Sequence, residues 1–328
     1  MIVVSISCIT YNHAPYIREC LEGFLMQDCD FEYEILIHDD ASTDGTQEII
    51  EEYVQKYPDL IKPIYQTENQ WSKEIRPTFS FNLPRAKGKY IALCEGDDYW
   101  TDPLKLQKQV DFLENNSDCS MCYHSVRNIF MTEGKKDIIV GYETVNNVKF
   151  TSEEFIKRHY ARTVSLLFKT TILLNYPKWT FESPIGDYPL QMVCALHGAV
   201  GYIGGDPMAV YRVGVPGSTN DGRFGTNDEQ KAWIIRRLKN FKKSRDLFNR
   251  NSSFKYDAII QGHKYWFSFT MLSAGLYKFN RLEMLKLYIE YIPYPLKANR
   301  DHFIFAIRFL LGPTLYNRIK KGKNKNND

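Results

Sequence analysis

The chain has 328 residues, of which 44% are hydrophobic and 14% aromatic, so it can bury a sizeable core and is not a disordered protein. Its net charge of +3 hides an asymmetry, because residues 1–228 carry 21 basic and 32 acidic side chains whereas residues 229–328 carry 21 and 7. The basic part predicts a surface that faces a polyanion or an anionic membrane. The sequence contains no apolar run of about 18 to 20 residues, which excludes a membrane-spanning helix.

The seven cysteines are odd in number and lie mostly inside apolar runs, which predicts buried free thiols in a reducing compartment. Cys119 and Cys122 have CxxC spacing, but their strand-like surroundings favour neither a redox motif nor a zinc site. The first residues, MIVVSISCITYN, lack a basic n-region and predict a strand rather than a signal peptide. We expect a cytoplasmic protein, either free or peripheral on the inner face of the cell membrane.

Short apolar runs alternate with amphipathic stretches through the first 125 residues. The predicted elements, in chain order, are strand 2–9, helix 15–27 opened by Pro15, strand 33–40, helix 43–57, strands 61–66 and 89–95, and helix 102–116 opened by Pro103. Strands separated by helices of this length predict an α/β fold with a mostly parallel sheet flanked by helices. In such sheets, ligands bind at the carboxyl ends of the strands.

The pattern loosens after residue 126. Residues 126–186 predict short strands and a helix near 151–160, as an insertion over the rim of the sheet. A helix that begins at Asp187 follows, and residues 201–213 predict two short strands or a hairpin.

The last hundred residues predict helices, including 228–248 and 281–292, and end in a polar tail that we expect to be disordered. We therefore expect an α/β domain over 1–228 and a basic helical region over 229–328.

Carboxylates follow two of the predicted strands. Asp39 and Asp40 end the second strand, and Glu95, Asp97 and Asp98 follow the fourth. Like charges so close together repel one another and call for a positive partner. A hard divalent cation, Mg²⁺ or Mn²⁺, completed by the diphosphate of a substrate would supply that charge. The alternative is that the last two aspartates only cap the next helix or lie in a solvated turn.

Four motifs occur in a characteristic order within residues 3–190: VSISCITYN, YEILIHDDASTDGT, AKGKYIALCEGDDYW and IGDYPLQ. In this combination the sequence resembles glycosyltransferase family 2, the inverting nucleotide-sugar glycosyltransferases with the GT-A fold. The resemblance implies a nucleotide-sugar half over about 1–125 and an acceptor half over about 126–228. It also implies metal-dependent transfer of a sugar, expected from a UDP-sugar, to a growing cell-surface glycan such as lipopolysaccharide, capsule or exopolysaccharide.

By the same resemblance, Thr10, Tyr11 and Asn12 lie beside the nucleotide. Asp40 then binds the base, and Asp39 supports the turn that follows the second strand.

The DXD-type group of the family corresponds to Asp97 and Asp98, which the resemblance places against the ribose and the metal ion. Glu95 stands where the family has an aspartate, which leaves its contact with the metal open. Relatives also carry a histidine shortly after the Tyr-Arg of the last core strand, whereas Val213 and Gly214 follow it here. We therefore expect the metal to rest on Asp98, phosphate and water.

Asp187 corresponds to the acidic residue that the family places on the acceptor side. A carboxylate there can remove the proton of the attacking hydroxyl, and no covalent nucleophile is needed for inversion. The competing interpretation is that Asp187 only caps its helix. His13, near a phosphate, and Trp100 and Trp71, stacked on a sugar or a base, are further candidates, although tryptophans beside a core more often pack against it.

Other function classes fit less well. A sugar nucleotidyltransferase would need a glycine-rich, cationic first turn, and TYNHAPY has neither feature. A non-catalytic sugar- or partner-binding module predicts loss of acidic positions, which are present here apart from the exchange at Glu95. No nucleic-acid motif accompanies the basic region, so we expect no nucleic-acid partner. Its stretches 232–248 and 303–321 either lie on an anionic membrane, where polyprenyl-linked glycan acceptors are found, or pack as a helical extension.

Overall fold

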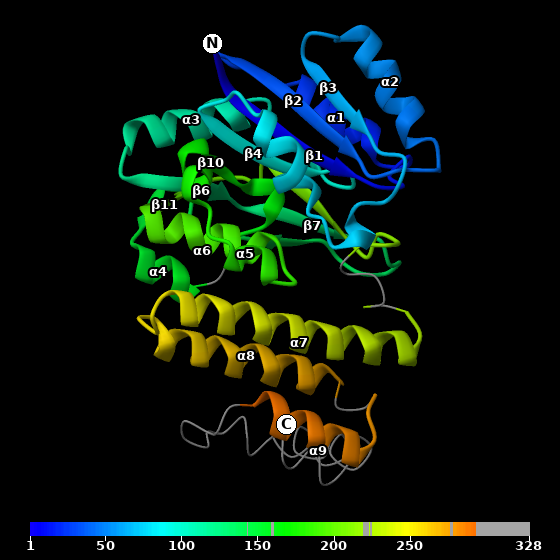
Figure 1. Ribbon diagram of the computed structural model, residues 1–328, viewed down its shortest axis with the longest axis vertical. Coiled ribbons are helices and arrows are strands. Elements are labelled where there is room, and N and C mark those ends of the chain that lie inside the picture. Colours follow the sequence, from blue (N-terminus) through cyan, green and yellow to red (C-terminus); the bar gives the residue numbers. More distant parts are fainter. Residues whose placement is uncertain (143, 159–160, 219–222, 224, 276–277, 293–328) are drawn as a thin grey trace, which may run out of the picture. The chain divides into compact units, whose positions relative to one another are not determined.

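The computed structural model describes residues 1–292, except 143, 159–160, 219–222, 224 and 276–277. The chain divides into two compact units, Met1–Val215 and Pro216–Asp328. The first unit contains all the strands of the described part, and the second is helical where it is described (Figure 1). The polar tail and the apolar stretch 303–321 lie outside the described residues, and the expectations about them stay predictions.

An eight-stranded sheet forms the body of the first unit (Figure 1). Its strands are β1 (Ile2–Thr10), β2 (Glu32–Asp39), β3 (Ile61–Tyr65), β4 (Tyr90–Glu95), β6 (Cys119–His124), β9 (Val148–Phe150), β10 (Leu167–Lys169) and β11 (Ala199–Ile203). They lie in the order β3-β2-β1-β4-β10-β6-β11-β9. The first four pair in parallel, as predicted, and β10 runs antiparallel between β4 and β6.

A second, four-stranded sheet has the order β5-β12-β7-β8. Its strands are β5 (Tyr99–Trp100), β7 (Val126–Phe130), β8 (Ile138–Val140) and β12 (Ala209–Val213). Because β11 pairs with β6 and β9 whereas β12 pairs with β5 and β7, the stretch 201–213 forms two strands in different sheets. The hairpin alternative for this stretch is wrong.

Helices connect the parallel strands where the sequence predicts them. They are α1 (Ile17–Leu25), α2 (Thr46–Lys56) and α3 (Lys105–Asn115). The starts predicted at Pro15 and Pro103 are two residues too early, because each proline lies in a turn before its helix. In the turn before α3, Oδ1 of Asp102 accepts the amide of Leu104 at 2.8 Å.

The part of the first unit after β7 adds three helices: α4 (Ser152–Arg158), α5 (Trp179–Glu182) and α6 (Asp187–His197). The predicted start of α6 at Asp187 is confirmed.

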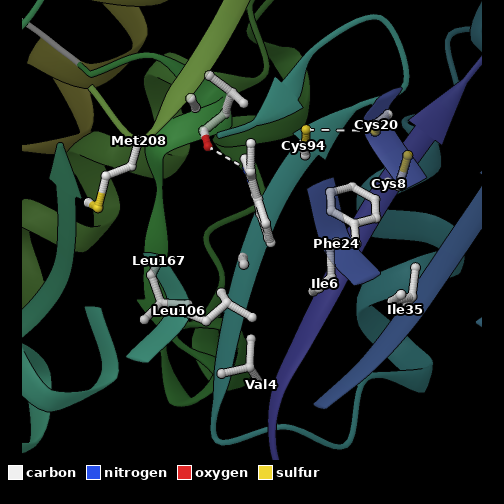
Figure 2. Close-up of a cluster of buried hydrophobic side chains, with 14 of the residues drawn as sticks. Val4, Ile6, Cys8, Cys20, Phe24, Ile35, Cys94, Leu106, Leu167 and Met208 are labelled. Carbon is white, nitrogen blue, oxygen red and sulfur yellow. Dashed lines mark hydrogen bonds between the residues drawn. The ribbon is translucent and has the colours of Figure 1, made fainter. Parts of the chain in front are cut away.

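Apolar side chains of β1, β2 and β4 pack against α1 and α3 to form the core of the first unit. Figure 2 shows part of it, with Ile6 and Cys8 of β1 near Phe24 of α1. All seven cysteines are free and six of them are buried, as the sequence predicts. Burial of this one apolar layer fixes the first four strands in register, so their carboxyl ends meet at a single rim.

The segment between β3 and β4 is tied to that rim by one buried amide. Nδ2 of Asn82 donates to the Oγ of Ser7 at 3.1 Å and to the carbonyl oxygens of Cys8 and Leu36 at 3.0 Å each. Arg85 adds a bond to the Ile37 carbonyl at 2.9 Å. A single π-helical turn, Thr78–Asn82, ends at this amide. These bonds hold a long connecting segment against the ends of β1 and β2.

The second unit has its own small apolar core. Its helices are α7 (Asn227–Asn251), α8 (Asp257–Gly275) and α9 (Arg281–Tyr291). Capping boxes start α7 at Thr226 and α9 at Asn280, as each side chain accepts the amide of the glutamate three residues later. Among the described residues, no helix is long and apolar enough to cross a membrane.

Candidate functional site

The two acidic clusters that the sequence singles out lie on one rim of the large sheet. In the register of the parallel strands, Thr10 of β1 pairs with Asp39 of β2, and Ile9 pairs with Glu95 of β4. The amide of Asp40 donates to the carbonyl oxygen of Thr10 at 2.9 Å. The ends of three adjacent strands therefore build one surface.

Glu95, Asp97 and Asp98 are close enough to share an ion. Each offers a carboxylate oxygen, and these atoms all lie within 4.8 Å of one another. Asp97 and Asp98 are 6% and 1% exposed, and Oδ1 of Asp97 is buried without a hydrogen-bond partner. Gly96 allows the acidic turn to lie close to the end of β1, because a Cβ at this position would be 2.7 Å from the Oγ1 of Thr10.

The cluster is short of positive charge. Burial raises the pKa of Glu95 to about 8, and the neighbouring charges of Asp97 and Asp187 act in the same direction. Burial also raises the pKa of Asp98 well above its usual range, again with help from Asp97 and Glu95. Ionised carboxylates are therefore costly here until a cation arrives.

Arg212 of β12 is the basic residue that contacts the cluster in the described part of the chain. Its backbone amide donates to Oδ1 of Asp98 at 2.8 Å, and its Nη1 donates to the carbonyl oxygen of Asp97 at 2.5 Å. Its Nη2 pairs with Glu19 of α1. The guanidinium thus holds the backbone of the acidic turn, but its own charge is partly neutralised by Glu19. From the sequence we used Arg212 only to locate the last core strand and missed this role.

These observations fit a hard divalent cation. Three carboxylates, an unpaired buried oxygen on Asp97 and acidic groups that resist ionisation form the oxygen-rich donor set that Mg²⁺ and Mn²⁺ prefer. The interpretation of Asp97 and Asp98 as simple helix caps does not hold, because α3 begins later, at Lys105.

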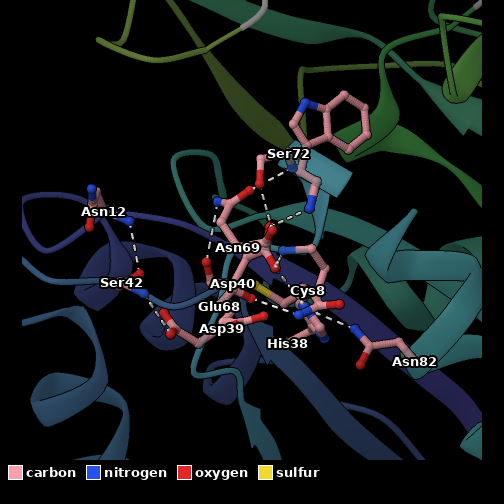
Figure 3. Close-up of polar contacts among 12 residues, drawn as sticks. Cys8, Asn12, His38, Asp39, Asp40, Ser42, Glu68, Asn69, Ser72 and Asn82 are labelled. Atoms are coloured by element: carbon pink, nitrogen blue, oxygen red, sulfur yellow. Dashed lines mark hydrogen bonds and ion pairs between the residues drawn. The ribbon is translucent and has the colours of Figure 1, made fainter. Parts of the chain in front are cut away.

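The carboxylates of Asp39 and Asp40 already have partners in the protein, as Figure 3 shows. Oδ1 of Asp39 accepts the amide of Ser42 at 3.0 Å, which supports the turn after β2, while its Oδ2 is buried without a partner. Asp40 accepts the amides of Gln70 and Trp71 at 2.7 and 3.0 Å. The contact of Asp40 with a nucleotide base stays a prediction. Its visible role is to hold the segment around Trp71 at the rim.

The turn after β1 divides into structural residues and residues with unpaired polar atoms. Asn12 is structural, because its backbone has φ 55° and its Oδ1 accepts the amide of Thr43 at 2.8 Å. Tyr11 is 46% exposed. Oγ1 of Thr10 and Nδ1 of His13 are buried and have no hydrogen-bond partner. Burial lowers the pKa of His13, so its neutral ring can accept a hydrogen bond.

The two tryptophans differ. Trp100 is 1% exposed, donates from Nε1 to the Val164 carbonyl oxygen at 3.1 Å and packs edge-on against Phe24. It belongs to the core and is not free to stack on a ligand. Trp71 is 53% exposed, and its ring lies beside the guanidinium of Arg76, whose Cζ is 5.9 Å from the ring centre.

Asp187 is the first residue of α6. The helix cap position is occupied by Gly186, and Oδ1 of Asp187 accepts the amide of Tyr188 at 2.8 Å. Its charge contributes to the raised pKa of Glu95, which places it within electrostatic range of the acidic cluster. The structure therefore brings together the carboxylate expected on the acceptor side and the carboxylates expected on the donor side.

Comparison with known proteins gives a consistent match. Residues 5–174 match the sequence profile described as Glycosyl transferase family 2. The uncharacterized protein Rv1520 of Mycobacterium tuberculosis is 48% identical over 134 residues, which cover 41% of this chain and 38% of Rv1520. TuaG of Bacillus subtilis, named as a teichuronic acid biosynthesis glycosyltransferase, is 35% identical over 115 residues, which cover 35% of this chain and 43% of TuaG. The chain spans about two fifths of the length of these relatives.

Solved structures show a shared fold at low identity. The structure of Staphylococcus aureus TarS in complex with UDP-GlcNAc has a TM-score of 0.56 at 15% identity and covers 95% of this chain and 92% of its own. The Pyrobaculum calidifontis mannosyltransferase PcManGT in complex with GDP-Man and Mn²⁺ has a TM-score of 0.56 at 16% identity. The match covers 97% of this chain and 83% of PcManGT. The predicted GT-A fold is confirmed.

Glu95 predicts a pH-dependent stability of the metal-free protein. Its carboxyl has a pKa of about 8 in the folded protein against an ordinary value of 4.5, so ionisation disfavours the folded state. The folded state binds the extra proton between these values, and stability should therefore fall as pH rises from about 5 to 8. We expect Glu95→Gln to flatten the fall in melting temperature measured in EDTA. Glu153→Gln, at an exposed position, is the control. If the melting temperature of Glu95→Gln fell with pH as steeply as that of the wild type, Glu95 would not be the group with the raised pKa.

Proposed function

The chain belongs to glycosyltransferase family 2, and from this premise we propose that it is a metal-dependent inverting glycosyltransferase. It moves a sugar from a nucleotide-sugar donor to a hydroxyl of a growing cell-surface glycan. The observation that carries the proposal is the cluster of half-buried Glu95 with buried Asp97 and Asp98 at the rim where β1, β2 and β4 end, with Asp187 within electrostatic range. The nucleotide-sugar half is about 1–125 and the acceptor half about 126–228.

The donor site is assigned to the ends of the first strands. Asp97 accepts from the ribose, and Thr10 and His13 contribute the unpaired polar atoms beside it. Tyr11 and Asn12 line the nucleotide, and Asp39 and Asp40 shape its base pocket. The named complexes of TarS with UDP-GlcNAc and of PcManGT with GDP-Man support a nucleoside diphosphate sugar. We favour UDP among the nucleotides.

Asp98 and Asp97 would hold the cation, with Glu95 as a third oxygen donor. Bound there, Mn²⁺ or Mg²⁺ would neutralise the charge that grows on the departing diphosphate. The Mn²⁺ named with PcManGT supports this choice of ion. The protein's own contribution is to keep the carboxylates buried and together, and the Arg212 backbone amide fixes the orientation of Asp98.

Asp187 is assigned as the general base. Inversion needs one group that takes the proton of the acceptor hydroxyl on the face opposite the leaving diphosphate. Asp187 lies at the start of a helix, where the amide of Tyr188 fixes one of its oxygens. Its second oxygen can take the proton.

For the acceptor we assign only a chemical class, a surface glycan anchored at a membrane. TuaG is named for the biosynthesis of teichuronic acid, which supports a surface glycan. The basic helices of the second unit support an acceptor anchored at a membrane, such as a polyprenyl-linked glycan. Exposed positions on α7 include Ile235 together with Arg236, Lys239 and Lys243, a pairing of apolar and basic side chains that suits an anionic interface.

Asp98→Ala should abolish metal-dependent binding of UDP and leave the fold intact, because loss of a like-charged neighbour relieves repulsion in the metal-free protein. Calorimetric titration of UDP with and without Mn²⁺ measures this. The matched control is Asp102→Ala, whose carboxylate pairs with Lys108. We expect the control to bind UDP as the wild type does. Equal affinities for wild type and Asp98→Ala would remove the metal-site interpretation.

Asp187→Asn keeps the shape of the side chain but removes the proton acceptor. We expect a melting temperature and a UDP–Mn²⁺ affinity close to wild type, with transfer slowed by roughly 10²–10⁴-fold, as for a lost general base. Release of UDP from a panel of nucleotide sugars gives the rate. Undiminished transfer would exclude Asp187 as the base. If the wild type binds UDP–Mn²⁺ and transfers nothing across broad donor and acceptor panels, a non-catalytic binding module is favoured instead.

If the second unit binds a membrane surface, the protein should float with vesicles that contain anionic lipid and not with neutral vesicles. Binding should weaken as salt rises through physiological ionic strength, because the attraction is electrostatic. Replacement of Arg236, Lys239 and Lys243 by glutamine should reduce flotation, whereas replacement of three exposed lysines of the first unit should not. Equal flotation with both kinds of vesicle would favour helices that serve only as an extension of the fold.

A further inference from the structure

Arg76 links two segments that the sequence keeps more than a hundred residues apart. It lies between β3 and β4, one residue before the proline that precedes the π-helical turn Thr78–Asn82. Its Nη2 donates to the backbone carbonyl oxygen of Ser183, in the segment that leads into α6. A side chain of the nucleotide-sugar half is thereby fixed at the entrance to the helix that begins with Asp187.

The other terminal nitrogen of Arg76 is buried and has no hydrogen-bond partner. It faces the start of α6, because a Cβ built on Gly186 would lie 2.9 Å from it. A guanidinium nitrogen that is out of water and unpaired is costly unless a negative group completes it. Asp187, the residue after Gly186, is the adjacent carboxylate.

The charges around Arg76 also support a pairing of Arg76 with Asp187. Burial lowers the pKa of Arg76, and the groups that oppose this are Tyr176 and Asp187. Asp187 also acts on Glu95 of the acidic cluster. The carboxylate of Asp187 therefore lies within electrostatic range of both the Arg76 guanidinium and the acidic cluster.

Aromatic packing keeps the two segments together independently of the guanidinium. Phe79 stacks on Tyr176 with ring centres 4.9 Å apart and meets Phe181 edge-on at 5.8 Å. Phe79 lies in the π-helical turn, and its two partners flank or belong to α5. Arg76 thus projects from a segment that is packed against α5 and the residues before it.

We propose that Arg76 is a positioning residue for Asp187: the guanidinium, fixed by Ser183 and backed by Trp71, holds the carboxylate of Asp187 ionised and oriented for the acceptor. This role rests on the proposed function of Asp187 as the base. Arg76 acts through Asp187 and is not itself assigned a contact with the reacting atoms. It offsets the acidic cluster, which would otherwise favour a protonated, inactive Asp187.

A double-mutant cycle tests the pairing without any substrate. Unfolding by urea is measured for wild type, Arg76→Gln, Asp187→Asn and the double variant. We expect the effects on the unfolding equilibrium constant to deviate from additivity by roughly threefold or more, as for side chains in direct interaction. Arg85→Gln replaces a similarly half-buried arginine that bonds the Ile37 carbonyl and Asn82, and its effect should be additive with Asp187→Asn. Additivity in the Arg76 cycle would overturn the proposal, whatever the activity.

Kinetics test the consequence, with release of UDP from UDP-GlcNAc or UDP-glucose in the presence of Mn²⁺ as the probe. We expect Arg76→Gln to lower kcat about 10- to 100-fold with an unchanged Kd for UDP, and to move the acidic limb of the pH–rate profile to higher pH. Arg76→Lys keeps the charge and should restore the position of that limb. An unmoved limb in Arg76→Gln would overturn the proposal. Coupling in the cycle together with no turnover by any variant, wild type included, would support the contact and count against the proposed function instead.

Discussion

The constraint on which the rest of this structure depends is a buried excess of negative charge at one strand end. Glu95 ends β4, and Asp97 and Asp98 follow it within three positions. Burial makes the ionised forms of Glu95 and Asp98 costly. Arg212 contributes a backbone amide and a guanidinium, but the guanidinium is shared with Glu19. A fold that only needed stability would place apolar or neutral side chains here. Retaining the carboxylates makes sense if a cation and a diphosphate complete them.

Hydrogen bonds from side chains to the backbone hold the segments around the acidic cluster in place, so the carboxylates cannot move apart. Asn82 fixes the β3–β4 segment to the ends of β1 and β2 through one amide group. Asp40 fixes the segment around Trp71 through two backbone amides. Both side chains bond polar groups of the backbone. As a result, the rim is rigid where the carboxylates meet, and its unpaired atoms on Thr10, His13 and Asp97 point to a ligand.

The sequence predicted the parts of the fold that local pattern controls. Alternating apolar runs located β1 to β4 and α1 to α3, and Asp187 was correctly placed at the start of α6. Long-range features were missed because nothing local encodes them. Trp100 precedes a predicted helix and was a candidate for stacking on a ligand, although core packing was the more common expectation. It packs against Phe24 of α1 and donates to the carbonyl oxygen of Val164. The antiparallel insertion of β10 between β4 and β6 has no counterpart in the residue pattern.

The two arginines show the same limit at the site itself. In the sequence, Arg212 served only to mark the last core strand. Arg76 gave no signal, because a lone arginine in a connecting segment is by default a solvated charge. Their partners lie far along the chain: Glu19 for one and Ser183 for the other. Both place a cation beside a carboxylate-rich surface without neutralising it. In the proposed reaction, a cation held by the acidic turn would neutralise the departing diphosphate. Asp187, which lies within electrostatic range of Glu95, would take the proton of the acceptor hydroxyl.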